Sequence, residues 1–405
     1  MYRNPLIVAR WGLFIITIML LSGCWNRNEL NDLSIVLALG VDKVGKQYEV
    51  SVQMMDPSSL ARNRTTTTNR SPTIVFSQTE HTLFEAIRKI TTSSSRRMYV
   101  SHLRFIVFDE KTAKEGIQNA LDFLFRDQEV RPDFYMAVAK GCKAKDIIGF
   151  VSPTEVLPGM DMYKSLKKSE RVWSPTSAVN VREIMSKFTM EGTEPVLTGL
   201  ALHGVKEEGE TLNNVRRPIP LANYVYEGIG VFKGDKLIGW LNEDESIGYN
   251  HMINNAKSSV AKLRCPGEAD GWFNVELLRS KARIKPSIVN GRPYIEVHVK
   301  AQANIGEVQC AVDVTDPEMQ KKMQKTAADR LYSILEKSVI KAKEYEADIF
   351  GFGEAFHRKY PRQWRTWKSD WGERFKNELT VHYKVDFQIL LHGKINNPFS
   401  VESKR

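Results

Sequence analysis

The sequence contains few cysteines, and none of them lies in a metal-binding pattern. Cys24, Cys142, Cys265 and Cys310 form no Cys-x-x-Cys pair, and no histidine lies at ligand spacing beside them. This arrangement excludes the common structural zinc sites and predicts no metal. If Cys24 is consumed by a lipid, three thiols remain, and Cys265–Cys310 is the pair to test first. The alternative is three buried free thiols that behave as small hydrophobic residues.

Catalytic motifs are also lacking. The chain has no G-x-S-x-G, no H-E-x-x-H and no phosphate-binding P-loop. Two segments, at 228–230 and 351–353, begin as Gly-x-Gly, but neither has the third glycine of a dinucleotide fingerprint. The sequence therefore predicts no catalytic residue, no bound cofactor and no enzymatic activity.

Beyond the N-terminus, no apolar run is long enough to cross a membrane, which takes about 20 residues. The N-terminus itself has a targeting pattern: Arg3 and Arg10 precede a short apolar run at 13–21. This run ends in Leu21, Ser22, Gly23 and Cys24, which form a lipobox. The two small residues fit the signal peptidase, and the Cys24 thiol receives a diacylglyceryl group. We expect cleavage before Cys24 and anchoring by two acyl chains; an uncleaved signal anchor is the alternative.

The charge is strongly positive. The formal net charge is +10, and loss of Arg3 and Arg10 with the leader leaves +8. Such a charge favours an anionic partner, either acidic lipid headgroups or nucleic acid. Because an exported protein rarely meets nucleic acid, we expect a membrane and protein partners, and no nucleic acid.

Hydrophobic periodicity divides the rest of the chain into three blocks. Residues 1–23 form the leader, and the blocks are 24–195, 196–270 and 271–405. Strands are expected at 34–39, 48–52, 103–108, 135–139, 196–202, 228–232, 237–241, 273–278, 282–285, 294–299 and 379–391. Asn290-Gly291 is expected to join two extended runs by a type I′ turn. Helices are expected at 83–90, 111–125, 146–150, 160–166 and 181–188, after Asn242, and over about thirty residues after Asp316-Pro317. The predicted fold class is α+β with three domains, each a mostly antiparallel or mixed sheet flanked by helices.

Two segments are rich in basic residues and could be taken for binding surfaces. Trp364, Trp367 and Trp371 share one helical face among basic residues, as either a packed aromatic stripe or a lipid-facing patch. We favour the packed stripe. Residues 56–73 are rich in threonine and arginine and are interpreted as a plain loop.

Several stretches together resemble the Ger(x)C family of spore-germination lipoproteins. The lipobox cysteine opens CWNRNELNDL at 24–33, and Gly40-Val41-Asp42 follows. Further matching stretches are TLFEAI (82–87), SSSRRMYVSHL (93–103), LDFLFRD (121–127), EVRP (129–132), GVFKGDKLIGWL (230–241) and GFGEA (351–355), followed by Pro361 and Trp364. The resemblance covers nearly the whole mature chain.

The resemblance implies a non-enzymatic C subunit of a nutrient germinant receptor. Such a subunit is displayed on the outer face of the spore inner membrane and acts with membrane-embedded A and B subunits. Its matches are densest at 82–108, where Arg96, Arg97 and His102 are the candidate partner-surface residues. The alternative function is a substrate-binding lipoprotein of a transporter. The sequence does not reveal which nutrient is sensed.

Overall fold

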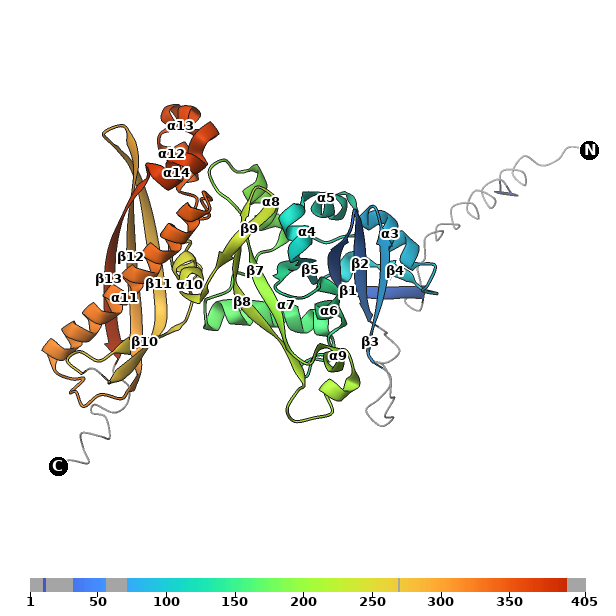
Figure 1. Cartoon of the computed structure of the whole chain (residues 1–405), viewed down its shortest axis with the longest axis horizontal. Coiled ribbons are helices and arrows are strands. Elements are labelled where there is room, and N and C mark those ends of the chain that lie inside the picture. Colours follow the sequence, from blue (N-terminus) through green and yellow to red (C-terminus); the bar gives the residue numbers. More distant parts are fainter. Residues whose placement is uncertain (1–9, 12–31, 56–70, 269, 392–405) are drawn as a thin grey trace, which may run out of the picture.

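The computed structural model describes residues 10–11, 32–55, 71–268 and 270–391, and these form an α+β fold with two sheets (Figure 1). The first sheet has nine strands in the order β3-β2-β1-β5-β6-β7-β8-β9, with β4 paired to β1. Its strands are β1 (Leu33–Val44), β2 (Gln47–Met55), β3 (Thr73–Glu80), β4 (Arg97–Tyr99), β5 (Phe105–Asp109), β6 (Tyr135–Ala139), β7 (Val196–Gly204), β8 (Ala222–Lys233) and β9 (Lys236–Leu241).

The middle of this sheet is parallel and buried on both faces. β1, β5, β6 and β7 pair in parallel, whereas β2, β3, β8 and β9 are added by antiparallel pairing. Parallel strands need crossover helices that cover the faces of the sheet, which explains the continuous apolar runs. The helices are α3 (Leu83–Ile90), α4 (Glu110–Glu115), α5 (Gln118–Arg126), α6 (Ala144–Gly149), α7 (Pro158–Val172), α8 (Val181–Thr189) and α9 (Lys206–Gly209), with 3₁₀ turns η2 (Val100–His102) and η3 (Leu212–Asn214).

Two hydrophobic clusters lie on opposite faces of the nine-stranded sheet. α3, α5 and α8 contribute Ile90, Leu121 and Ile184 to the larger cluster, while α6 and α7 contribute Ile148 and Leu166 to the smaller one. This part of the chain therefore has a helix–sheet–helix layering.

The second sheet has four strands in the order β10-β11-β12-β13. Its strands are β10 (Val260–Arg264), β11 (Trp272–Val289), β12 (Arg292–Val308) and β13 (Thr380–Leu391). The helices of this half are α10 (Glu243–Met252), α11 (Pro317–Glu344), α12 (Phe352–Lys359), α13 (Pro361–Trp367) and α14 (Trp371–Asn377), with the 3₁₀ turn η4 (Lys368–Asp370). α10 and α11 pack on the sheet's inner face, where Ile295, Val297 and Val299 share a core with Ile229 and Val231 of the first sheet. The outer face of the four-stranded sheet consequently points away from the rest of the molecule.

Local signals predicted several elements correctly. Asn290 and Gly291 both have positive φ, 51° and 76°, as a type I′ hairpin turn requires. The side chain of Asp316 caps α11, with Pro317 at its first position, and Asn242 forms a capping box with Glu245.

Other boundaries differ from the prediction. The helix expected at 111–125 is two helices, because Gly116 has a φ of 128° and lies against the Asp235 carboxylate. The two strands expected at 273–278 and 282–285 form one strand, β11, which accommodates a bulge after Leu277. Residues 56–70 of the predicted basic loop lie outside the described residues, and Thr73 already begins β3.

The sheets divide the chain differently from the predicted domains. The predicted boundary at 195–196 falls between β6 and β7, which pair with each other inside one sheet. β8 and β9, expected in a separate middle domain, complete the edge of the same sheet. The division into three domains stays a prediction; the described residues contain two sheets.

Candidate functional site

The predicted lipidation site, Cys24 with Leu21, Ser22 and Gly23, lies outside the described residues. Within the parts of the chain that the structure does describe, no helix combines the length and apolarity that a membrane span needs. The anchor therefore stays a prediction from sequence.

The candidate partner residues lie on β4 and η2 beside the start of β1. Arg97 is exposed and forms an ion pair with Glu129, and the exposed His102 ring lies 5.7 Å from the ring of Tyr99. Arg96 is half-buried and lines a hollow beside Met54 and Phe76, whereas Arg97 lines a different one. The three side chains thus share a segment without forming one site, and their role stays a prediction.

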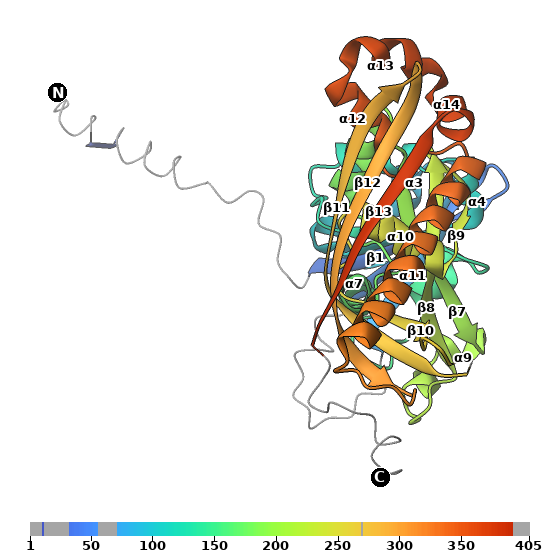
Figure 2. The ribbon, with the colours of Figure 1, turned by 90° about the vertical axis from the view of Figure 1, so that its left-hand side faces the viewer.

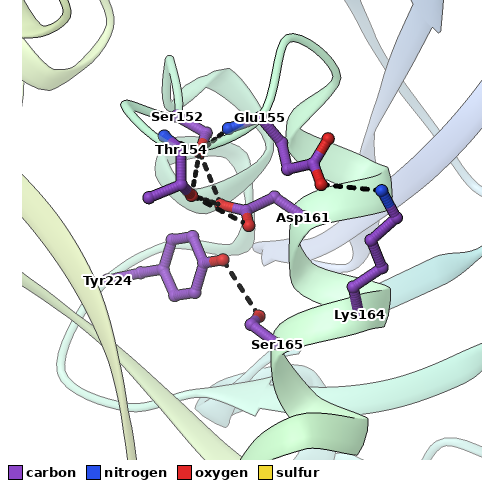
Figure 3. Close-up of polar contacts among 7 residues, drawn as sticks. All are labelled: Ser152, Thr154, Glu155, Asp161, Lys164, Ser165 and Tyr224. Carbon is purple, nitrogen blue, oxygen red and sulfur yellow. Dashed lines mark hydrogen bonds and ion pairs between the residues drawn. The ribbon is translucent and has the colours of Figure 1, made fainter.

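A cleft of about 810 Å³ lies between α7 and β8. At one end Asp161, which is 7% exposed, accepts hydrogen bonds from the hydroxyls of Ser152 and Thr154 (Figure 3). Lys164 and Glu155 form an ion pair of 2.6 Å beside it. This network holds the 152–155 turn against the first turns of α7.

The tyrosine hydroxyls of β8 complete the network. Tyr224 and Tyr226 lie 3.0 and 2.9 Å from the Ser165 hydroxyl, and Tyr226 also donates to the Met162 carbonyl. Burial raises the pKa of both tyrosines, so they stay protonated donors. Among the described residues, no histidine or lysine bonds to the Ser165 hydroxyl, so nothing there activates it as a nucleophile.

The charged groups at the rim of the cleft pair with one another. Glu227 bonds to His203 at 2.6 Å and lies 3.9 Å from Lys140, and the Trp173 indole donates to Glu243 at 2.7 Å. Hydrogen bonds and ion pairs therefore engage the polar side chains around the cleft, with Asp161 and Glu243 satisfied by neutral donors. Sequence reasoning missed the cleft, because Asp161 and Ser165 lie about sixty residues from the tyrosines; the two-residue spacing of Tyr224 and Tyr226 on a strand was the available signal.

The motifs behind the resemblance hold elements together. Asp42 is buried and accepts the backbone N–H groups of Ala144 and Lys145, both at 2.8 Å, at the start of α6. A Cβ on Gly40 would lie 2.9 Å from Ile148, so the Gly-Val-Asp motif lets α6 approach β1 closely. Burial, and secondarily Asp109 and Glu49, raises the Asp42 pKa to about 6, although its two backbone hydrogen bonds oppose the shift.

The Gly-Phe-Gly motif has the same kind of role at the junction of the two sheets. The buried Asp348 carboxylate accepts four backbone N–H groups from residues 350–353 and the indole N–H of Trp371. Trp364, Trp367 and Trp371 are buried, which confirms the packed stripe and rules out the lipid-facing patch. The three indoles belong to the shared core.

The search for metal-binding clusters gives none among the described residues. Cys265 and Cys310 form a disulfide with a Cα–Cα distance of 6.2 Å, which is the pairing that the sequence analysis put first. Cys142 is a half-buried free thiol. Burial raises the pKa of Cys142 to about 11, so its thiol is unreactive at neutral pH.

Comparisons with known proteins cover both halves of the chain. Residues 26–202 match a family model described as the spore germination protein N-terminal domain. Residues 227–393 match a model described as spore germination B3/GerAC like, C-terminal. The chain is 29% identical over 397 residues to spore germination protein KC of Bacillus subtilis (strain 168), covering 97% of each protein. It is 20% identical over 388 residues to spore germination protein GerQC of Bacillus cereus, covering 95% of this chain and 99% of that protein.

A solved structure supports the fold. The crystal structure of the GerBC protein aligns with a TM-score of 0.52 at 19% identity, covering 87% of this chain and 96% of that one. The fold and the two matched halves together define a spore germination protein of GerAC type. The chain belongs to the Ger(x)C family.

Proposed function

We propose that this chain is a lipid-anchored, non-enzymatic subunit of a spore nutrient germinant receptor. It acts through protein contacts with membrane-embedded A and B subunits. One observation carries the proposal: the N-terminal family match begins at Asn26, two residues after the lipobox cysteine. The folded family domain therefore follows directly on the predicted lipidated residue.

The covalent diacylglyceryl group on Cys24 is the only cofactor in this proposal. Two acyl chains hold a protein at a bilayer far more firmly than one. The anchor confines the subunit to the outer face of the spore inner membrane and so raises its effective concentration toward membrane partners. The non-enzymatic role is supported by the named relatives, which are spore germination proteins, and by the unactivated hydroxyl of Ser165.

The test replaces Cys24 by alanine in spores. We expect loss of palmitate labelling, loss of the protein from the membrane fraction and at least a tenfold slower nutrient response. Cys142→Ala is the matched control, because this half-buried free thiol is not part of the lipobox sequence, and it should keep both label and response.

Normal germination of unlabelled Cys24→Ala spores would refute the anchoring role. Cross-linking from dormant spore membranes distinguishes the alternative function. Recovery of permease-like and A-type subunits supports the proposal, whereas recovery of a transporter ATPase instead indicates a substrate-binding lipoprotein.

A further inference from the structure

The outer face of the four-stranded sheet carries an unusual concentration of positive charge. Register places side chains from β11, β12 and β13 in successive rows on this face. The basic face consists of five exposed side chains on three neighbouring rows: Arg279, Lys281, Arg283, Lys300 and Lys384. Lys281 stands directly opposite Lys300, and Arg283 and Lys384 flank His298.

These cations outnumber the acidic groups beside them. Asp386 stands opposite Lys300 in the register but bonds to His298 at 2.6 Å, and Glu296 pairs with Lys285 at 3.4 Å. The hydrogen bond from His298, and more weakly the charges of Lys384 and Lys300, lower the pKa of Asp386, so one carboxylate is shared among several cations. None of the five basic side chains has an ion pair within the described residues. Like charges directly opposite each other on a sheet are destabilising. The Lys281–Lys300 pair therefore lowers the stability of the folded chain.

A hollow of about 370 Å³ lies over the same rows. Three cations, Arg279, Lys281 and Lys300, line it together with one carboxylate, Asp386. Gln302 and Gln388 complete the lining, and their amides bond to each other at 3.2 Å. Guanidinium, ammonium and amide donors at the spacing of neighbouring strands suit carboxylate groups presented along a chain. The hollow has room for acidic side chains to lie between the rows.

The chain itself does not supply the missing anion. Residues 392–405, which follow β13, contain Lys394, Lys404 and Arg405 against a single Glu402, so they add positive charge. A second copy would bring the same positive net charge, +10 over the whole sequence. The occupant is therefore a different molecule.

We propose that the basic face binds an acidic segment of a partner protein. A membrane surface fits less well, because charged and amide groups make up most of these rows, with Leu278 and Leu390 as the large aliphatic side chains exposed beside them. Figure 1 places this sheet at the opposite end of the molecule from β1, the first strand after the predicted anchor in the sequence, and Figure 2 views the molecule from the end that carries the sheet. Only this last point rests on the proposed function. Single-stranded nucleic acid also fits less well, because these rows offer no Phe, Tyr or Trp ring on which bases could stack.

The test measures binding of a fluorescent oligoglutamate peptide to the purified full-length chain in detergent. We expect binding that weakens as salt rises from about 50 to 300 mM, because screening shortens the reach of exposed charges. The triple variant Arg279→Glu, Lys281→Glu and Lys300→Glu should bind at least tenfold more weakly. Lys111→Glu, Lys322→Glu and Lys325→Glu, three exposed residues elsewhere, give the same charge change and should bind within about twofold of wild type.

Two further measurements keep the result decisive. The Lys281→Glu variant alone should melt at or above the wild-type temperature, because it converts a repulsive cross-strand pair with Lys300 into an attractive one. A loss of peptide binding by this variant would then not be due to unfolding. Equal binding by the two triple variants would overturn the proposal. Binding to phosphatidylglycerol vesicles or to single-stranded DNA that depends on the basic face, without peptide binding, would also overturn it. None of these outcomes depends on the lipid or on germination.

Discussion

At the scale of single residues, the family motifs are explained by packing and hydrogen bonding. Asp42 satisfies two N–H groups at the start of α6 that would otherwise be unpaired, and Gly40 lets that helix approach β1. The sequence marked these positions, but the resemblance alone did not reveal what they contact. The contact lies about a hundred residues away, where no local pattern connects the partners.

Asp42→Asn should change the pH dependence of stability. The folded-state pKa of Asp42 is about 6, above the ordinary 3.8, so between these values the folded state binds more protons than the unfolded state. Its contribution to the free energy of unfolding therefore falls as pH rises through this window, by up to about 3 kcal/mol. Urea titrations at about pH 4 and pH 7 should show the asparagine variant gaining relative to wild type at the higher pH. Asp329→Asn, an exposed site on α11, should show no such gain, and an equal gain there would contradict the assignment.

At the scale of elements, local chemistry predicted turns and helix starts, and long-range packing decided where elements stop. The Asn290-Gly291 turn and the Asp316-Pro317 cap formed as expected, because each depends on two adjacent residues. The break at Gly116 was missed because Asp235, on the β8–β9 turn, sets that conformation by contact. The last strand was likewise expected at 379–391, but not that β13 pairs in parallel with β12.

The disulfide should stabilise the end of the four-stranded sheet. Cys265 and Cys310 are 45 residues apart in the sequence. Removing a cross-link that closes a loop of this length, with Cys310→Ala, should lower the free energy of unfolding by about 3–4 kcal/mol. Reductant should destabilise wild type by a similar amount and leave the variant unchanged in a denaturant titration. Cys142→Ala serves as the control: its thiol forms no disulfide, so this variant should keep the wild-type response to reductant. A reductant-insensitive wild type would show that the bridge does not form in solution.

At the scale of the whole molecule, the two sheets are joined by a close junction between the 190–194 segment and α12. Glu354 donates its backbone N–H to the Gly192 carbonyl, the Trp364 indole donates to Glu191 at 2.8 Å, and Glu194 donates its N–H to the Asp348 carbonyl. A hydrophobic core also spans both sheets. We therefore expect the described chain to unfold as a cooperative unit.

Gly353→Ala should weaken this junction. The added Cβ would lie 2.7 Å from the Cα of Gly192 and from the indole of Trp364, both of which are held in place by neighbours. Overpacking of this kind costs about 1–3 kcal/mol, measured as a lower urea midpoint. Gly306→Ala is the matched control, since its nearest neighbouring atom is 3.9 Å away, and its effect should stay below about 0.5 kcal/mol. An equal loss in both variants would mean that Gly353 is not a tight contact.

The sequence by itself predicted the Asn290-Gly291 turn, the helix caps, the α+β class and the family, because each is carried by short segments or by residue order. The leader and lipobox are predictions of the same local kind. The tertiary structure alone decided that β7, β8 and β9 complete the first sheet, that the tryptophans are buried at the junction, and that five cations lie together on one uncovered face. These features join residues far apart in sequence through strand register and side-chain packing, neither of which a single stretch of chain encodes.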